Sequence, residues 1–312
     1  MLRRIRLRFR RALMVLSMST IAFAIFTTFY CVRTEGHRPQ HAYVFYATQD
    51  TYACSVLINL FSLRYLFHTN HRVIVLISED ISSNYKEAFA DIGATVLVRA
   101  PPPLHRDSIE YYQGCLLKLL AFQLFDLDPP LERVIVMDSD QLILKDLDPA
   151  FDLPLGGILA PKAYWIDNET YSSTLMEFHP SHGLWKDVEE ALQQVPADTY
   201  DMDIANHIFR DSLQELPPTY GTLNSHWEDN NVPLWMMSGE GQTTTLDMDD
   251  RLRELFSRVH VVHFTAVGKP WMYDVAELLQ LRPNAHPLFV EQWACWRTRA
   301  LQLCPHGIVD HV

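Results

Sequence analysis

The stretch Val134-Ile-Val-Met-Asp138-Ser-Asp140-Gln-Leu-Ile-Leu144 places two carboxylates between apolar runs. The apolar residues before Asp138 are typical of a buried strand, and ligands of open α/β sheets collect just beyond such strand ends. Two hard oxygen donors on one turn suit a divalent cation such as Mn²⁺ or Mg²⁺, which would offset the cost of burying charge. Asp-Ser-Asp is also common in ordinary turns and helix caps, so the motif alone leaves both interpretations open.

Alternating apolar segments around this stretch predict an α/β domain. Strands are expected at residues 42–48, 72–78, 94–98 and 133–137, and helices at residues 52–68, 84–91, 110–125, 184–194 and 202–211. Strand, helix, strand, helix, strand is the order of a doubly wound fold. We expect one domain over residues 41–312, whose C-terminal third, rich in Trp, Pro and His, forms loops over the sheet.

The N-terminal segment has the features of a signal anchor. Residues 1–33 contain seven arginines and no acidic residue, and the uncharged run 12–32 is long enough to cross a bilayer. The positive-inside rule then makes residues 1–11 a cytoplasmic tail, with a linker at 33–40 and a lumenal remainder. A cleaved signal peptide is the alternative, but the end of the run offers no small-x-small cleavage site.

Composition limits the partners of the remainder. Residues 34–312 carry 19 Lys and Arg against 38 Asp and Glu, a formal net charge of −19. Such a surface repels a phosphate backbone, so nucleic-acid binding is not expected.

The cysteines give weaker signals. The sequence contains no C-x-x-C pair, so a structural zinc site is not expected. A Cys295–Cys304 disulfide is suggested only by proximity in sequence. Asn168-Glu-Thr170 is an N-glycosylation acceptor sequence or a chance match.

A second polar cluster, His263-Phe-Thr-Ala-Val-Gly268-Lys269-Pro-Trp271, follows the expected strand Arg258-Val-His-Val-Val262. A neutral imidazole at His263 could supply a third protein ligand to a cation, although a lone histidine is more often a core residue. Gly268 would let the backbone approach a phosphate closely, and Lys269 is a compact cation suited to a phosphate oxygen.

Three further residues have simple interpretations from the sequence alone. Lys118 is the only charge within the apolar run 114–124, and it either snorkels at a helix edge or contacts a ligand. Asp201 can cap the start of a helix. Tyr52 reads as a core aromatic residue at a helix start.

The motifs together resemble those of the glycogenin-like glycosyltransferases of family 8. Besides the D-x-D stretch, the resemblance rests on residues 42–52, Leu116-Leu-Lys118-Leu, Asp201-Met-Asp-Ile-Ala-Asn206 and the segment from His263 to Trp271. It covers most of residues 41–275 and implies a GT-A type, Rossmann-like mixed sheet flanked by helices. The first strand and the arginine-flanked anchor look most like fungal Golgi N-acetylglucosaminyltransferases, which implies a single-pass type II protein of the Golgi membrane.

The resemblance also implies a role for each candidate residue. Asp138, Asp140 and His263 would bind Mn²⁺ or Mg²⁺. The other implied donor contacts are Thr48 and Tyr52 at the uracil, Ser139 at the ribose, and Gly268, Lys269 and Lys118 at the phosphates or sugar. Asp201 would face the transferred sugar, so Asp201 and Lys118 are the catalytic candidates.

The implied reaction moves a sugar, with N-acetylglucosamine as the first choice, from a UDP-sugar to a glycan or glycoconjugate with retention of configuration. Met202 replaces the family's Gln, Ser172-Ser173-Thr174 replaces Asn-Ser-Gly, and Ala266 replaces a Gly, so the donor sugar is not inherited from the family. One alternative is a non-catalytic lumenal protein that binds nucleotide sugars. A D-x-D phosphatase is a weaker alternative, because Leu142 stands where such enzymes have Thr.

Overall fold

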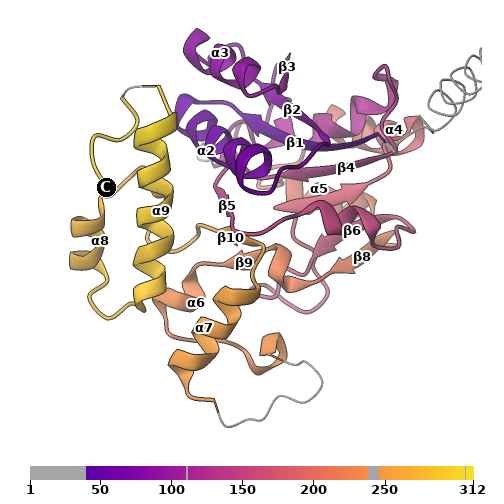
Figure 1. Cartoon of the computed structure of the whole chain (residues 1–312). Coiled ribbons are helices and arrows are strands. Elements are labelled where there is room, and N and C mark those ends of the chain that lie inside the picture. Colours follow the sequence, from indigo (N-terminus) through magenta and orange to yellow (C-terminus); the bar gives the residue numbers. More distant parts are fainter. Residues whose placement is uncertain (1–39, 110–111, 238–245, 306) are drawn as a thin grey trace, which may run out of the picture. The chain divides into compact units, whose positions relative to one another are not determined.

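The computed structural model of the chain describes residues 40–109, 112–237, 246–305 and 307–312 (Figure 1). The expected cytoplasmic tail, the anchor at 12–32 and all but the last residue of the linker lie outside these ranges. Among the described residues, no helix combines the length and the apolar character that crossing a membrane requires.

A seven-stranded sheet in the order β3-β2-β1-β4-β7-β6-β8 forms the centre of the domain (Figure 1). Its strands are β1 (His41–Ala47), β2 (Arg72–Ile77), β3 (Thr95–Val98), β4 (Arg133–Met137), β6 (Ile158–Pro161), β7 (Leu175–Phe178) and β8 (Leu213–Leu216). The first four strands are parallel, and β7 runs antiparallel to β4. The sheet is therefore mixed, as the resemblance implied, and the four predicted strands are confirmed.

Both faces of the sheet are covered. Along β1, Tyr43 and Phe45 belong to one buried cluster, while Ala42 and Val44 belong to another on the opposite face. Side chains alternate across a strand, so a nearly continuous apolar run fits a strand buried on both faces. The helices are α2 (Asp50–Phe61), α3 (Ser83–Asp91), α4 (His182–Gln193), α5 (Asp201–Ile208), α6 (Ser225–Glu228), α7 (Met248–Arg258), α8 (Val275–Leu281) and α9 (Pro287–Leu303).

Short helical segments of other types complete the chain. A π-helix (Ser62–Leu66) continues α2, and 3₁₀ helices span Cys115–Asp126, Asp148–Asp152, Pro218–Tyr220 and Leu234–Met237. The prediction of a helix at residues 110–125 is thus corrected: residues 110 and 111 lie outside the described ranges, and the helix from Cys115 is 3₁₀.

A second, three-stranded sheet joins distant parts of the chain. It consists of β5 (Gln141–Ile143), β10 (Val261–His263) and β9 (Thr222–Leu223), with β10 in the middle. The antiparallel pairing of β5 with β10 sets His263 opposite Gln141, and the parallel pairing with β9 sets His263 beside Leu223. Because β5 follows the D-x-D turn directly, this small sheet brings His263 to the end of β4.

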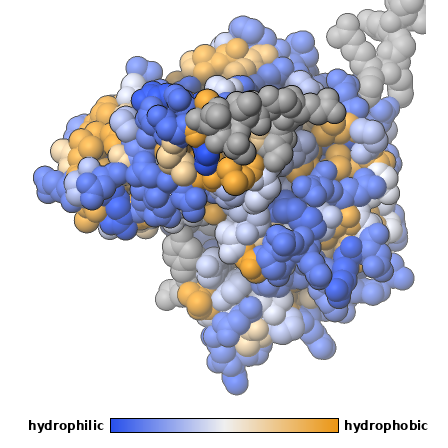
Figure 2. Space-filling view, turned by 90° about the horizontal axis from the view of Figure 1, so that it is seen from below, coloured by the Kyte–Doolittle hydropathy of each residue, from blue (hydrophilic) through white to orange (hydrophobic). Residues whose placement is uncertain are grey.

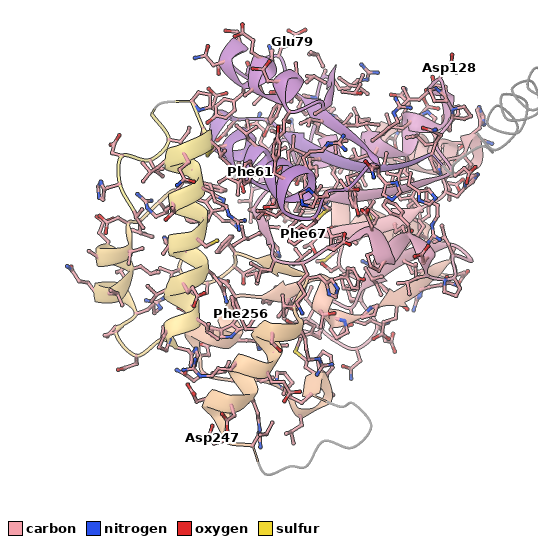
Figure 3. All side chains as sticks on the ribbon, viewed as in Figure 1. Phe61, Phe67, Glu79, Asp128, Asp247 and Phe256 are labelled. Atoms are coloured by element: carbon pink, nitrogen blue, oxygen red, sulfur yellow. A yellow bond between two sulfur atoms is a disulfide. The ribbon has the colours of Figure 1, made fainter. Side chains whose placement is uncertain are left out.

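The C-terminal third contains the helices α6 to α9, so the prediction that this region forms loops was wrong. α9 packs against α2 (Figure 1) and buries Phe289, Trp293 and Trp296, at the helical spacings i, i+4 and i+7. The Trp296 indole donates to Ser55 Oγ at 3.0 Å. Nearby, Phe256 on α7, labelled in Figure 3, meets Trp227 edge-on with ring centroids 5.7 Å apart. Trp227, Phe289, Trp293 and Trp296 are therefore core residues.

A disulfide joins Cys54 of α2 to Cys304 at the end of α9, with Cα atoms 5.3 Å apart. The suggested Cys295–Cys304 pair is wrong, and Cys295 is a free thiol. The reason is that nine helical residues separate those two positions by roughly 13 Å, beyond the reach of a disulfide.

Removing this bridge should destabilise the domain. We expect the Cys54→Ala/Cys304→Ala variant to lose about 2–4 kcal/mol of unfolding free energy, because a crosslink between distant positions restricts the unfolded chain. Urea unfolding measures the loss, and Cys295→Ala, which removes a free thiol, is the control. Equal stability of the two variants would contradict a structural role for the bridge.

Candidate active site

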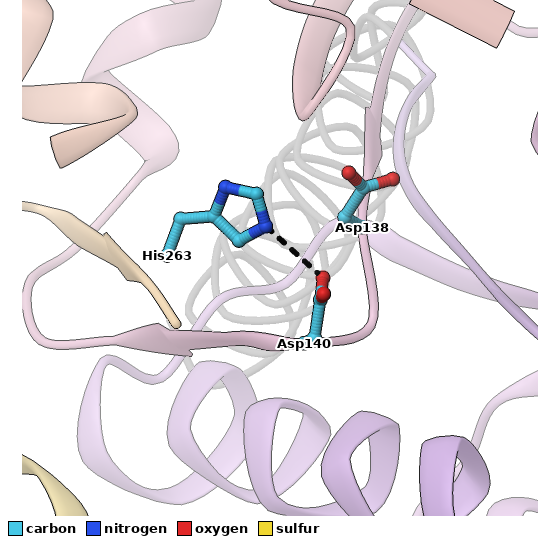
Figure 4. Close-up of side chains that lie close together, drawn as sticks. All are labelled: Asp138, Asp140 and His263. Carbon is cyan, nitrogen blue, oxygen red and sulfur yellow. Dashed lines mark ion pairs between the residues drawn. The ribbon is translucent and has the colours of Figure 1, made fainter. Parts of the chain in front are cut away.

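Three potential metal ligands meet at the carboxyl end of β4 (Figure 4). Asp138, Asp140 and His263 each offer one ligand atom, and these atoms all lie within 4.8 Å of one another. Asp138 follows β4, Asp140 precedes β5, and His263 ends β10. The structure thus brings together the three residues that the sequence singled out as metal ligands.

Asp140 is held by two basic side chains. Lys269 Nζ lies 2.5 Å from its Oδ2 atom and His263 Nε2 lies 3.4 Å from its Oδ1 atom. Burial alone would raise the pKa of Asp140, but Lys269 and then His263 outweigh it and hold the pKa well below its usual range. The Asp140 side chain is therefore a carboxylate over the whole physiological pH range.

The segment that carries Lys269 is fixed by backbone geometry. The Lys269 ammonium also donates to the Phe264 carbonyl at 2.5 Å. Gly268 has φ +118, and a Cβ there would lie 2.8 Å from Met272 Sδ. A side chain at position 268 would be both strained and crowded, so the turn that positions Lys269 requires glycine.

Lys118 bridges two carboxylates. Its Nζ atom lies 2.6 Å from Asp138 Oδ1, 2.6 Å from Asp201 Oδ2 and 3.2 Å from Ser173 Oγ. The side chain is 1% exposed, so the snorkelling interpretation was wrong. Burial would lower the pKa of Lys118, but Asp138 and Asp201 raise it above its ordinary value. Lys118 is therefore a buried cation that ties the D-x-D turn to α5.

Asp201 begins α5 without capping it, because the N-cap residue is Tyr200. Its Oδ2 atom accepts a hydrogen bond of 2.5 Å from Ser173 Oγ in addition to the Lys118 contact. Burial would raise the pKa of Asp201, but Lys118 and Ser173 lower it. Asp138 differs: burial raises its pKa despite the opposing effect of Lys118.

The charges of this group fit a divalent cation. Asp138, Asp140 and Asp201 contribute three carboxylates, whereas Lys118 and Lys269 contribute two ammonium groups. Two carboxylate oxygens and one imidazole nitrogen within 4.8 Å form a donor set that suits Mn²⁺ or Mg²⁺. These residues could hold such an ion at the carboxyl end of β4.

A cavity of about 410 Å³ opens over the three ligands. Its walls include most predicted site residues, namely Thr48, Tyr52, Asp138, Asp140, Asp201, His263 and Lys269, together with Met202 and Thr174. Tyr52 meets Trp271 edge-on at 5.2 Å. Ser139 is buried, and its hydroxyl donates to the Tyr46 carbonyl, so its side chain fastens the D-x-D turn to β1.

Sequence reasoning missed several side chains at this cavity. The Tyr46 hydroxyl donates to Asp138 Oδ1 at 3.0 Å, and Gly114, with φ +88, allows close contact with Thr48. Cys115 also lines the cavity, and burial together with Asp201 raises the pKa of its thiol to about 12, so the thiol stays protonated. Strand alternation places Tyr46 on one face but carries no signal of its contact with Asp138.

Asn224 was also missed, and it shapes the segment that follows His263. Its side-chain Oδ1 atom accepts from the Thr265 and Ala266 backbone amides at 2.8 and 3.0 Å, and its backbone N–H donates to the His263 carbonyl at 3.0 Å. The side chain is fully buried, so these bonds hold the connection between His263 and Lys269 in one conformation.

Comparison with known proteins finds both relatives by sequence and neighbours among solved structures. "Glucose N-acetyltransferase 1" of Gibberella zeae is 27% identical over 266 residues, covering 78% of this chain and 56% of its own length. Glycogenin of Komagataella phaffii is 23% identical over 72% of this chain and 56% of its own length. The chain thus spans little more than half of either relative. No protein-family model matches.

Among solved structures, the galactosyltransferase LgtC, crystallised with donor and acceptor sugar analogues, superposes with a TM-score of 0.58 at 18% identity. The match covers 85% of this chain and 97% of LgtC. The fold is therefore that of a GT-A type glycosyltransferase. Together with the named relatives, this confirms the resemblance to the glycogenin-like glycosyltransferases of family 8 that was read from the sequence.

Proposed function

We propose that the protein transfers a sugar from a UDP-sugar to a glycan or glycoconjugate, with retention of configuration and with help from a divalent cation, Mn²⁺ first. The observation that supports the proposal best is the meeting of Asp138, Asp140 and His263 within 4.8 Å, with Lys269 against Asp140. N-acetylglucosamine is the first choice of sugar. This choice is supported by the name of the Gibberella zeae relative, "Glucose N-acetyltransferase 1", which combines glucose with an N-acetyl group.

Each residue has a task in this proposal. A cation bound by Asp138, Asp140 and His263 would neutralise charge that develops on the departing diphosphate. Lys269 would bind a phosphate oxygen and stabilise the same charge. Thr48 and Tyr52 would bind the base, while Lys118 would hold Asp138 and Asp201 in fixed positions. Asp201, at the cavity wall, would contact the hydroxyls of the transferred sugar.

The cellular setting is a separate part of the proposal. We propose a type II protein of the Golgi membrane, anchored by residues 12–32, with the catalytic domain in the lumen. The Cys54–Cys304 disulfide supports an oxidising compartment for the domain. Fluorescence microscopy of the tagged full chain tests the location, and a cytosolic distribution would contradict it.

A donor screen tests the reaction. The full-length chain, incubated with the common UDP-sugars and Mn²⁺, should hydrolyse one of them slowly without acceptor, because water can reach the same cavity. EDTA should abolish this hydrolysis and added Mn²⁺ should restore it. Product analysis by NMR gives the anomeric configuration. If no UDP-sugar is consumed, or if EDTA leaves the rate unchanged, the proposal fails.

A further inference from the structure

An aromatic cluster stands at the edge of the cavity and takes no part in the chemistry described so far. Trp165 lines the cavity that holds Asp138, Asp140 and His263. Tyr164 lies next to it, with ring centroids 5.1 Å apart and an edge-on arrangement, and Trp235 contacts the same Tyr164 ring at 5.2 Å. We call Tyr164, Trp165 and Trp235 the aromatic platform.

The two tryptophans are exposed, which is unusual for side chains of this size. Trp165 is 38% exposed and Trp235 is 49% exposed, and their neighbours Ile166 and Leu234 are exposed as well. The face of the molecule seen in Figure 2 is mostly hydrophilic, with hydrophobic residues in separate groups. Apolar groups that remain together in water beside a cavity mark a binding surface.

Tyr164, the central residue of the platform, is held in place by hydrogen bonds. His226 Nδ1 lies 2.7 Å from the Asn231 carbonyl, which can only accept, so this nitrogen carries the proton. Burial lowers the pKa of His226, so the ring is neutral and its Nε2 atom accepts from the Tyr164 hydroxyl at 2.8 Å. The same Tyr164 oxygen accepts from the Leu223 amide at 3.2 Å. Both ring nitrogens of His226 and the Tyr164 hydroxyl therefore have hydrogen-bond partners.

The hydrogen bond between Tyr164 and Leu223 connects the aromatic platform to the candidate metal ligands. Leu223 lies in β9, and its register partner in β10 is His263. Tyr164 is therefore bonded to the strand adjacent to a candidate metal ligand, and Trp165 lies in contact with the same cavity. A ligand stacked on Trp165 would therefore lie at the edge of the cavity, and Trp235 contacts the same Tyr164 ring as Trp165.

We infer that the aromatic platform binds the acceptor as a neutral oligosaccharide, whose sugar rings stack on Trp165 and Trp235 while its terminal hydroxyl enters the cavity. This inference rests on the proposed function and adds the acceptor class. The C–H face of a sugar ring is weakly positive and packs on the negative face of an indole ring. A net charge of −19 over residues 34–312 disfavours an anionic chain.

Direct binding without nucleotide tests the inference independently of turnover. Calorimetry of the full chain with cellohexaose, mannohexaose and N-acetylchitohexaose should show binding of at least one, while a heparin hexasaccharide should not bind. Trp165→Ala and Trp235→Ala should each weaken the binding about tenfold, as expected for one lost stacking contact. Trp235→Phe, which keeps a ring, should lose less than Trp235→Ala. Leu279→Ala, an exposed apolar position on α8, should bind like wild type.

The outcomes separate this inference from the proposed function. Tryptophan-dependent saccharide binding without any donor hydrolysis would support the platform and sink the glycosyltransferase proposal. Donor hydrolysis without tryptophan-dependent saccharide binding would do the reverse. Binding of phosphatidylcholine vesicles that both tryptophan variants abolish, with no saccharide bound, would make the platform a membrane contact and overturn the inference.

Discussion

Asp140→Asn should lower the rate of UDP-sugar turnover by about 10²–10³-fold at saturating Mn²⁺, the range found when one charge-stabilising group is removed from an active site. The amide has the size of the carboxylate but no charge. It would no longer attract the Lys269 ammonium, now 2.5 Å away, and would be a poor ligand for a divalent cation. Both groups proposed to stabilise the departing diphosphate would thus be weakened by one substitution.

The measurement is donor hydrolysis across a Mn²⁺ titration, combined with calorimetry of UDP binding. We expect the variant to need much more Mn²⁺ and to bind UDP weakly at every Mn²⁺ concentration. Asp91→Asn, an exposed position at the end of α3, is the matched control and should retain wild-type behaviour. Turnover of Asp140→Asn within threefold of wild type, with an unchanged Mn²⁺ requirement, would remove Asp140 from the ligand set.

The site at the end of β4 was predictable because the signal lies within one short stretch of sequence. An apolar run of strand length, ending in two carboxylates, identifies the edge of a parallel sheet where ligands bind. That His263 completes the group depends on antiparallel pairing of β5 and β10, which lie more than a hundred residues apart. No spacing within the sequence encodes this pairing. Residue chemistry alone offered His263 either as a third ligand or as a core histidine, and the family resemblance favoured the ligand.

Lys118 and α9 show two ways in which the sequence misled. A single lysine in an apolar run suggests a solvent-seeking side chain, since the partners Asp138 and Asp201 that make its burial tolerable come from other elements. In α9, composition concealed the pattern: Pro and Trp were taken as loop residues, whereas the spacing of Phe289, Trp293 and Trp296 is helical. Periodicity was the better guide there.

Lys118→Met should destabilise the domain by about 3–5 kcal/mol, the range for removing one partner of a buried ion pair. The substitution leaves Asp138 and Asp201 buried without their shared cation, and methionine offers them no hydrogen bond. Turnover should fall together with stability, because Asp138 and Asp201 would no longer be held in their present positions. The exposed Lys186, which pairs with Glu190 on α4, provides the control, and Lys186→Met should unfold like wild type.

A double variant distinguishes uncompensated charge from lost packing. If buried carboxylates cause the destabilisation, Lys118→Met/Asp201→Asn should be more stable than Lys118→Met alone, because one of the two unpaired charges is removed. Urea unfolding in EDTA measures all four members of this cycle without interference from metal binding. If the two losses simply add, Lys118 contributes through packing alone and the proposed clamp between the D-x-D turn and α5 is wrong. Recovery in the double variant would show that the positions of Asp138 and Asp201 are set by one shared ammonium, which links the candidate metal ligand Asp138 electrostatically to the residue proposed to face the sugar.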